Sequence, residues 1–154
     1  MMNTLADNAA QQVQVDFYLL QGTNLQSIQQ FCCRLTEKAW KLGNTVFIRT
    51  ENEQQAQHLD NLMWTYSDGS FLPHAMENNT QTSETPIIIG SKTEPASAFD
   101  LMINLASDTP DHCNRYTRIV EIINEDETIK TQGRLRYSHY DENQHPLNHH
   151  NINA

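Results

Sequence analysis

The sequence has no long apolar run, no export signal and few positive charges. No stretch approaches the roughly 20 apolar residues that span a bilayer. Residues 1–12 lack the positive and apolar regions of a signal peptide. Ten Lys and Arg against 19 Asp and Glu give a net charge of −9, which argues against a broad basic surface that coats nucleic acid. We expect a soluble cytoplasmic protein that binds neither membranes nor, directly, nucleic acid.

Cysteine is also scarce. The chain has three, Cys32, Cys33 and Cys113, and no CxxC spacing. Adjacent cysteines on a helix point about 100° apart and cannot form an unstrained disulfide. We therefore expect three reduced thiols.

The five glycines are isolated, so the sequence contains neither GxGxxG nor GxxxxGK[ST]. The turn Gln21–Asn24, which follows the first predicted strand, holds one glycine, whereas a phosphate cradle needs several for close backbone approach. A GxSxG nucleophile motif and a clear acid/base pair of carboxylates are missing too. We expect no catalytic residues, no catalytic activity of the chain's own and no cofactor. The alternative is a doubly wound nucleotide-binding enzyme with a divergent phosphate loop.

Seven histidines raise the question of a metal site. His145, His149 and His150 are closely spaced, but they fall in a polar C-terminal segment without periodicity. A structural metal site needs a rigid framework. We expect no metal; the alternative is a metal-binding regulator that uses this tail.

Five short apolar runs predict strands, and continuous runs such as Ile87–Ile89 indicate strands covered on both faces. Amphipathic spacing predicts a helix from Leu25 to Leu42, and capping patterns at residues 50–53 and 124–127 predict two more. The alternation predicts an α/β protein: a three-layer α/β/α domain with a mostly parallel central sheet, Rossmann-like without a phosphate-binding loop. The expected strands are residues 13–20, 45–49, 86–90, 101–105 and 119–123.

The composition predicts three segments. Residues 1–12 are expected to form a disordered extension, residues 13–140 a single α/β domain, and residues 141–154 a flexible polar tail rich in His and Asn.

Aromatic residues cluster after the second predicted helix, where Trp64 and Tyr66 precede the run Phe71-Leu72-Pro73-His74. The cluster is either a plug of the core or an exposed patch for a protein partner, and we weigh these readings equally.

A second cluster reverses the charge of the chain. Residues 130–136 carry three of the ten Lys and Arg and no acid. On a helix, Lys130, Arg134 and Tyr137 share one face. The two cations could pair with the carboxylates of an acidic peptide while the tyrosine ring packs against an aromatic group of the same peptide. The alternative is a helix face that is simply solvated.

In this order, these blocks resemble the chi subunit family of bacterial DNA polymerase III. The resemblance runs from about Val15 to Tyr140. Its carrying pieces are Phe17–Leu20, Ala39–Gly43, Glu51–Ala56, Leu59–Trp64, Ser70–His74 and Lys130–Tyr137.

The resemblance implies a non-catalytic accessory subunit of a DNA-directed DNA polymerase, with two protein partners. One is the psi subunit of the clamp loader, and the residues that face it would be Trp64, Phe71, Pro73 and His74. The other is the acidic, phenylalanine-terminated tail of single-stranded-DNA-binding protein, which would contact Ile123, Lys130, Arg134 and Tyr137. One departure is Ser138, which stands where the family often has lysine.

Overall fold

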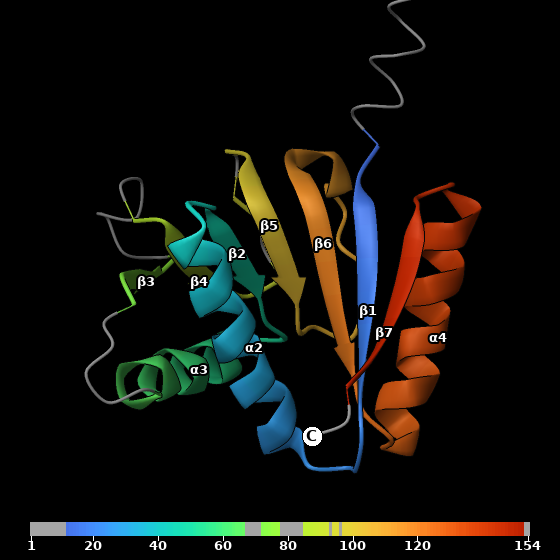
Figure 1. Ribbon diagram of the computed structural model, residues 1–154, viewed down its shortest axis with the longest axis horizontal. Helices are drawn as coiled ribbons and strands as arrows, with labels where there is room; N and C mark the ends of the chain where they lie inside the picture. The colour runs from blue at the N-terminus through green and yellow to red at the C-terminus, as the bar shows by residue number, and fades with distance from the viewer. Residues whose placement is uncertain (1–11, 67–71, 78–84, 93, 96, 153–154) are drawn as a thin grey trace, which may run out of the picture.

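The computed structural model describes residues 12–66, 72–77, 85–92, 94–95 and 97–152 (Figure 1). Within this part of the chain, strands and helices alternate as the apolar runs predict. The elements are β1 (Gln14–Leu20), α2 (Leu25–Lys41), β2 (Val46–Arg49), α3 (Glu53–Thr65), β3 (His74–Met76), β4 (Ile87–Gly90), β5 (Phe99–Asn104), a 3-10 turn (Cys113–Arg115), β6 (Tyr116–Ile123), α4 (Glu127–Glu142) and β7 (Leu147–Ile152).

The strands form one sheet in the order β3-β4-β2-β5-β6-β1-β7, and every pairing is parallel. Strands β2 and β4 are buried along their whole length. A sheet of parallel strands is usually covered on both faces, because the crossovers between its strands lie over them. This cover explains why the sequence of β4 is a continuous apolar run rather than an alternating one.

Alternate residues of each strand face two separate cores. Ile87 and Ile89 pack in the core that contains residues of α2 and α3, whereas Ile88 packs in the core that contains Tyr140 of α4. In Figure 1, α2 and α3 lie over the β4–β2 part of the sheet, and α4 lies at the end formed by β1 and β7. The predicted three-layer α/β/α fold is confirmed.

Residues 141–152 contain the end of a helix and a strand, which corrects the expectation of a flexible tail over residues 141–154; residues 153 and 154 lie outside the described part of the chain. Helix α4 continues to Glu142, and β7 then pairs in parallel with β1, with Val15 opposite Leu147 and Leu20 opposite Ile152. The sequence of β7 is polar because four of its six residues are exposed, so no apolar pattern marks it. Backbone pairing and ring stacking hold this edge strand instead.

The sequence does not predict strand β3 either. The strand is only three residues long and directly follows Pro73, so it gives no apolar pattern. Of the expected N-terminal extension, residues 1–11 lie outside the described residues.

Cys32 and Cys33 are both buried, although only Cys32 follows the apolar spacing of α2. Burial raises the pKa of Cys33 to about 12, so its thiol stays protonated at neutral pH.

A buried carboxylate joins α4 to the sheet. Glu121 of β6 is fully buried and accepts hydrogen bonds from Arg136 Nε at 2.9 Å and from the Tyr140 hydroxyl at 2.7 Å. Asn104 of β5 donates a third bond to it, at 2.9 Å. Burial raises the pKa of Glu121, and the charge and hydrogen bonds of Arg136 oppose that rise. A buried charge is tolerated only when it is paired and bonded in this way.

Asp16 makes a second polar link, between β1 and the strands on either side of it. It accepts a hydrogen bond from Arg118 Nε of β6 and lies 3.4 Å from His150 Nε2 of β7. Burial alone would raise the pKa of Asp16. The hydrogen bonds from Arg118 and Gln14 outweigh burial and hold this pKa below its ordinary value.

This lowered pKa predicts a pH dependence of stability. Ionised Asp16 stabilises the fold above the unfolded-state pKa of about 3.9, and that contribution is lost as pH falls through the lower folded-state pKa. We expect Asp16→Asn to lower the free energy of unfolding at about pH 6, with the difference from the wild type shrinking towards about pH 3. Urea unfolding at several pH values measures this difference. A difference that is the same throughout would contradict the assignment.

Gly133 of α4 provides a second test of the packing. Helix propensity predicts that Gly133→Ala stabilises the protein by about 1 kcal/mol. In the structure, a methyl group at this position would overlap Cδ1 of Ile123 and lie 3.2 Å from its Cγ1. We therefore expect a net loss of about 1–3 kcal/mol in urea unfolding. Ser138→Ala, at an exposed position of the same helix, is the matched control, and a Gly133→Ala variant more stable than the wild type would refute the contact.

Candidate protein-docking surfaces

Helix α4 carries the predicted basic face. The helix begins after Asp126, whose carboxylate accepts a hydrogen bond from the backbone N–H of Ile129 at 3.1 Å and so caps the first turn. The structure confirms that Lys130, Arg134 and Tyr137 lie on this one helix. Arg134 is exposed, and the other two are partly exposed.

The cations of the segment 130–136 differ in their availability. Arg136 is buried and paired with Glu121, so it does not belong to the docking face. Lys130 Nζ lies 3.8 Å from the carboxylate of Glu127, an exposed pair of the kind that contributes little. Arg134 has no ion-pair partner among the described residues. Two of the three cations therefore remain for a ligand, and Arg134 is the freer of them.

Ile123 reaches the same surface from the sheet. It ends β6, and the absence of a side chain at Gly133 lets α4 approach it closely. Beside it lies a hollow of about 350 Å³, whose lining includes Lys130 and Glu125. Leu19 of β1 and Ile152 of β7 also line this hollow, so an apolar floor lies next to a cation.

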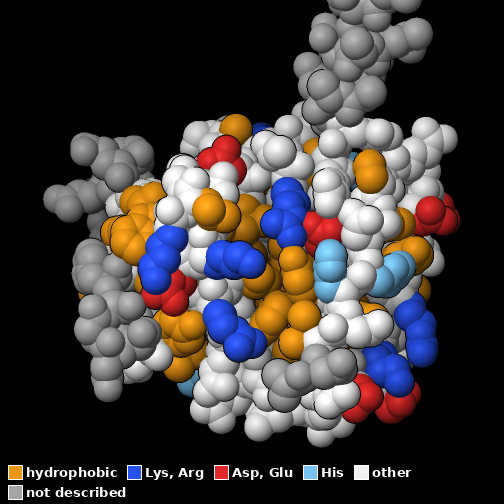
Figure 2. Space-filling view, in the orientation of Figure 1, with side chains coloured by type: hydrophobic (Ala, Val, Ile, Leu, Met, Phe, Trp, Pro, Cys, Tyr) orange, Lys and Arg blue, Asp and Glu red, His pale blue; other side chains and the backbone are white. Residues whose placement is uncertain are grey.

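Strand β7 contributes the part of this surface that the sequence analysis missed. The ring of His149 stacks on Tyr137 with centroids 5.2 Å apart, and Phe17 meets Tyr137 edge to face at 5.3 Å. These contacts fix the Tyr137 ring. In Figure 2, histidine side chains lie next to basic side chains at the α4–β7 end of the molecule. The adjacent pair His149-His150 is the one sign of this contact in the sequence, and it lies in a segment whose polar composition suggests a solvated tail.

The second predicted surface lies on α3 and β3. Trp64, near the end of α3, is 55% exposed, which favours the exposed patch over the core plug for this residue. Its ring packs against His74 with centroids 4.4 Å apart. Pro73 is partly exposed next to His74, whereas Phe71 lies outside the described residues, so a joint patch of Trp64 and Phe71 stays a prediction.

His74 has a structural role in this surface. It is buried, with Nδ1 2.6 Å from the carbonyl oxygen of Leu72 and Nε2 3.3 Å from a carboxylate oxygen of Asp60 in α3. The imidazole thereby connects β3 to α3 and supports the indole of Trp64 from beneath. A rigidly held aromatic side chain of this kind is suited to act as an interface anchor.

The loop after β1 is occupied by the protein's own carboxylate. Gly22, with a φ of +82°, donates its backbone N–H to Glu125 Oε1 at 2.8 Å, and the N–H of Glu125 donates to the Gly22 carbonyl at 2.8 Å. In dinucleotide-binding folds, the corresponding loop holds phosphate. A carboxylate in that position repels phosphate and occupies the donor. This geometry argues against the nucleotide-binding alternative.

The described residues contain no cluster of three or more His, Cys, Asp or Glu side chains placed to hold a metal ion. Among the described helices, none is both long enough and apolar enough to cross a membrane.

Comparison with solved structures shows a similar fold in another protein. The crystal structure of T4 UvsW superposes on 93% of this chain with a TM-score of 0.68 at 9% identity. This chain spans 42% of that protein, and at such low identity the likeness extends to the fold alone.

Comparison with known sequences identifies the family. Residues 13–148 match the family described as DNA polymerase III chi subunit. The Pseudomonas aeruginosa DNA polymerase III subunit chi is 30% identical over 138 residues, which are 90% of this chain and 96% of that protein. The Haemophilus influenzae subunit is 32% identical over 79% of this chain and 85% of its own length, and the Escherichia coli subunit 28% identical over 80% and 88%. With the parallel α/β fold already described, these matches show that the chain belongs to the DNA polymerase III chi subunit family.

Proposed function

We propose that this chain is a non-catalytic adaptor in the cytoplasm. It connects the clamp loader, through a psi subunit, to the acidic C-terminal tail of single-stranded-DNA-binding protein. The carrying observation is α4, which bears two available cations and a fixed aromatic ring in a protein with a net charge of −9. Lys130, the first of these cations, lines an apolar hollow beside the helix. Such a surface binds an acidic segment that ends in an aromatic residue.

Each part of the tail has a matching part in this surface. The guanidinium of Arg134 can hold both oxygens of a terminal carboxylate, whereas the ammonium of Lys130 acts as a point charge for acids further back. Ile123 lines the apolar hollow that would hold the phenylalanine ring, and we assign Tyr137 to the same site because of the family resemblance. Since Glu125 also lines the hollow, the carboxylate end of the tail belongs on the Arg134 side.

The psi subunit is assigned to the other surface, around Trp64. Exposed tryptophan is enriched among the residues that dominate binding energy, and here His74 holds the ring in place. Pro73 shapes the neighbouring loop, and we include Phe71 because of the family resemblance.

The two surfaces lie at opposite edges of the sheet. Strand β3, next to the Trp64 surface, begins the strand order, and β7, next to the α4 surface, ends it. Figure 1 shows α3 with β3 on one side of the molecule and α4 with β7 on the other. This arrangement lets two partners approach from opposite ends of the sheet, as an adaptor requires.

Arg134→Ala is expected to weaken binding of an acidic, phenylalanine-terminated peptide more than Lys130→Ala does. Arg134 makes the charge-assisted contact to the terminal carboxylate, so its loss costs about 2 kcal/mol, against about 1 kcal/mol for Lys130. The wild type should bind near −8 kcal/mol, a micromolar dissociation constant, and more weakly as salt screens the charges. Calorimetric titration of each variant measures these differences.

Lys38→Ala is the control for this experiment, because it removes an exposed cation from α2, away from the surface. It should leave the affinity unchanged. A second peptide without the terminal phenylalanine should bind much more weakly to the wild type. Equal affinities for both peptides, or for wild type and Arg134→Ala, would refute this assignment of the tail site.

Trp64→Ala is expected to abolish binding of the psi subunit, with a loss of at least about 2 kcal/mol, since a central aromatic anchor would be removed. Pull-down and calorimetry with psi from the same organism measure the loss. Leu42→Ala is the matched control, because Leu42 is another exposed apolar side chain, on the far end of α2. If both variants bind psi like the wild type, the partner uses another face.

A further inference from the structure

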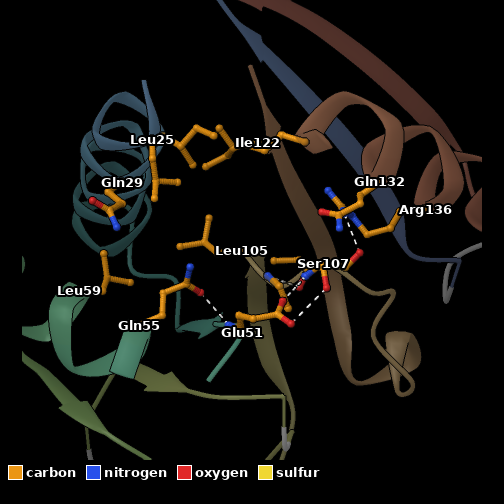
Figure 3. Close-up of a pocket in the computed structure, with 14 residues that line it drawn as sticks. Leu25, Gln29, Glu51, Gln55, Leu59, Leu105, Ser107, Ile122, Gln132 and Arg136 are labelled. Atoms are coloured by element: carbon orange, nitrogen blue, oxygen red, sulfur yellow. Dashed lines mark hydrogen bonds between the residues drawn. The ribbon is translucent and has the colours of Figure 1, made fainter. Parts of the chain in front are cut away.

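A cavity of about 330 Å³ lies away from both docking surfaces, at the carboxyl edge of the sheet. Its volume falls within the range of about 300–1,000 Å³ that is typical of small-molecule sites. Figure 3 shows side chains from α2 and α3 on one side of it, α4 on the other, and Glu51 with Ser107 at its base. In open parallel sheets, ligands bind at this edge. The position alone therefore makes the cavity a candidate site.

The walls of the cavity are aliphatic. Leu25 and Ile28 of α2 and Leu59 of α3 line one side, and Leu105 and Ile122 line the sheet side. Apolar walls of this kind accept the faces of a flat ring or an aliphatic group. Burial against these walls contributes to the affinity for a ligand but gives little specificity.

The charged groups of the cavity are already paired. Glu51 accepts hydrogen bonds from the backbone N–H of Ser107 at 2.6 Å and from its hydroxyl at 3.2 Å, and it pairs with Lys92 at 2.9 Å. Arg136 pairs with Glu121 and donates to the Ser107 carbonyl at 2.9 Å. No charged lining residue is left to neutralise an anion, so the cavity suits an uncharged ligand.

Three glutamine amides supply the unused hydrogen-bonding capacity. Gln29 is only 8% exposed, yet its side chain has no hydrogen-bond partner among the described residues. Gln132 likewise has none there. Gln55 accepts a bond from the Glu51 N–H at 2.7 Å, which leaves its NH₂ group for a ligand. None of these amide groups is a fully buried atom without a partner, so they face the water of the cavity. A ligand with matching donors and acceptors would take the place of that water.

We propose that this cavity binds a nucleobase. A base has flat apolar faces for the aliphatic walls and a neutral edge of donors and acceptors for the amides, and glutamine pairs with such edges, adenine above all. An aliphatic side chain of a protein partner would leave all three amides unpaired. Since Glu125 closes the loop after β1, recognition rests on the base rather than on a phosphate. The base comes either from a free nucleoside or from an unpaired nucleotide of a single strand.

The test is a titration of the full-length ¹⁵N-labelled chain, followed through the side-chain amide resonances of Gln29, Gln55 and Gln132. Separate titrations use adenosine, guanosine, cytidine, thymidine, ribose and ATP. We expect at least one nucleoside to shift these three resonances and ribose to shift none. ATP should bind no more tightly than adenosine. A single-stranded oligonucleotide that shifts the same resonances at lower concentration identifies the strand as the source of the base, and a shift by the nucleoside alone identifies the free nucleoside.

Gln29→Leu keeps the volume of the side chain and removes its amide, so we expect the affinity for the nucleoside to fall at least tenfold. Gln30→Leu is the matched control, because the neighbouring Gln30 lines a different hollow. Gln132→Leu, at a partly exposed position on α4, gives a second test if Gln29→Leu does not fold. The proposal is overturned if no nucleoside moves the three resonances, or if the foldable glutamine variants bind like the wild type. The tail-peptide titration is independent, so failure of one proposal leaves the other standing.

Discussion

The carboxylate of Glu121 is the group on which the position of α4 depends. It is buried in β6, and two of its three hydrogen-bond donors, Arg136 and Tyr140, come from one face of α4. These bonds form only in one rotation of the helix about its own axis. That rotation exposes Arg134, leaves Lys130 partly exposed, and places Tyr137 against Phe17 and Gly133 against Ile123. The candidate docking surface is thus fixed by a buried interaction beneath it.

Much of the fold follows from the sequence, and the omissions share a cause. The central strands are marked by apolar runs because both of their faces are covered. Helix α2 is marked by the spacing of its apolar residues and α3 by the capping pattern at residues 50–53, in which the structure has Asn52 as the N-cap. Strand β7 shows no such pattern, because an exposed edge strand is stabilised by backbone pairing with β1, whose position the sequence of β7 does not reveal. Apolar periodicity detects burial, so it misses strands that are little buried.

The candidate site shows the same limit at the level of residues. The helical spacing was sufficient to group Lys130, Arg134 and Tyr137. It could not separate Arg136, which belongs to the same basic segment but pairs with a carboxylate 15 positions away in the chain. Nor could it bring His149 to Tyr137, since that contact depends on β7. Local spacing predicts which residues share a face, whereas pairing across elements decides which of them remain available.

The net charge bears on how an acidic tail could be recognised. A chain of charge −9 repels an acidic peptide at long range. Attraction at the α4 surface acts within a Debye length of about 8 Å at physiological ionic strength, where the two nearby cations outweigh distant carboxylates. Salt therefore weakens the local pairing and also screens the overall repulsion. An acidic segment without the terminal aromatic residue meets the repulsion but gains nothing from the hollow beside Ile123. On this reasoning, the general acidity of the protein selects against non-specific acidic partners, and the apolar contact distinguishes the specific tail.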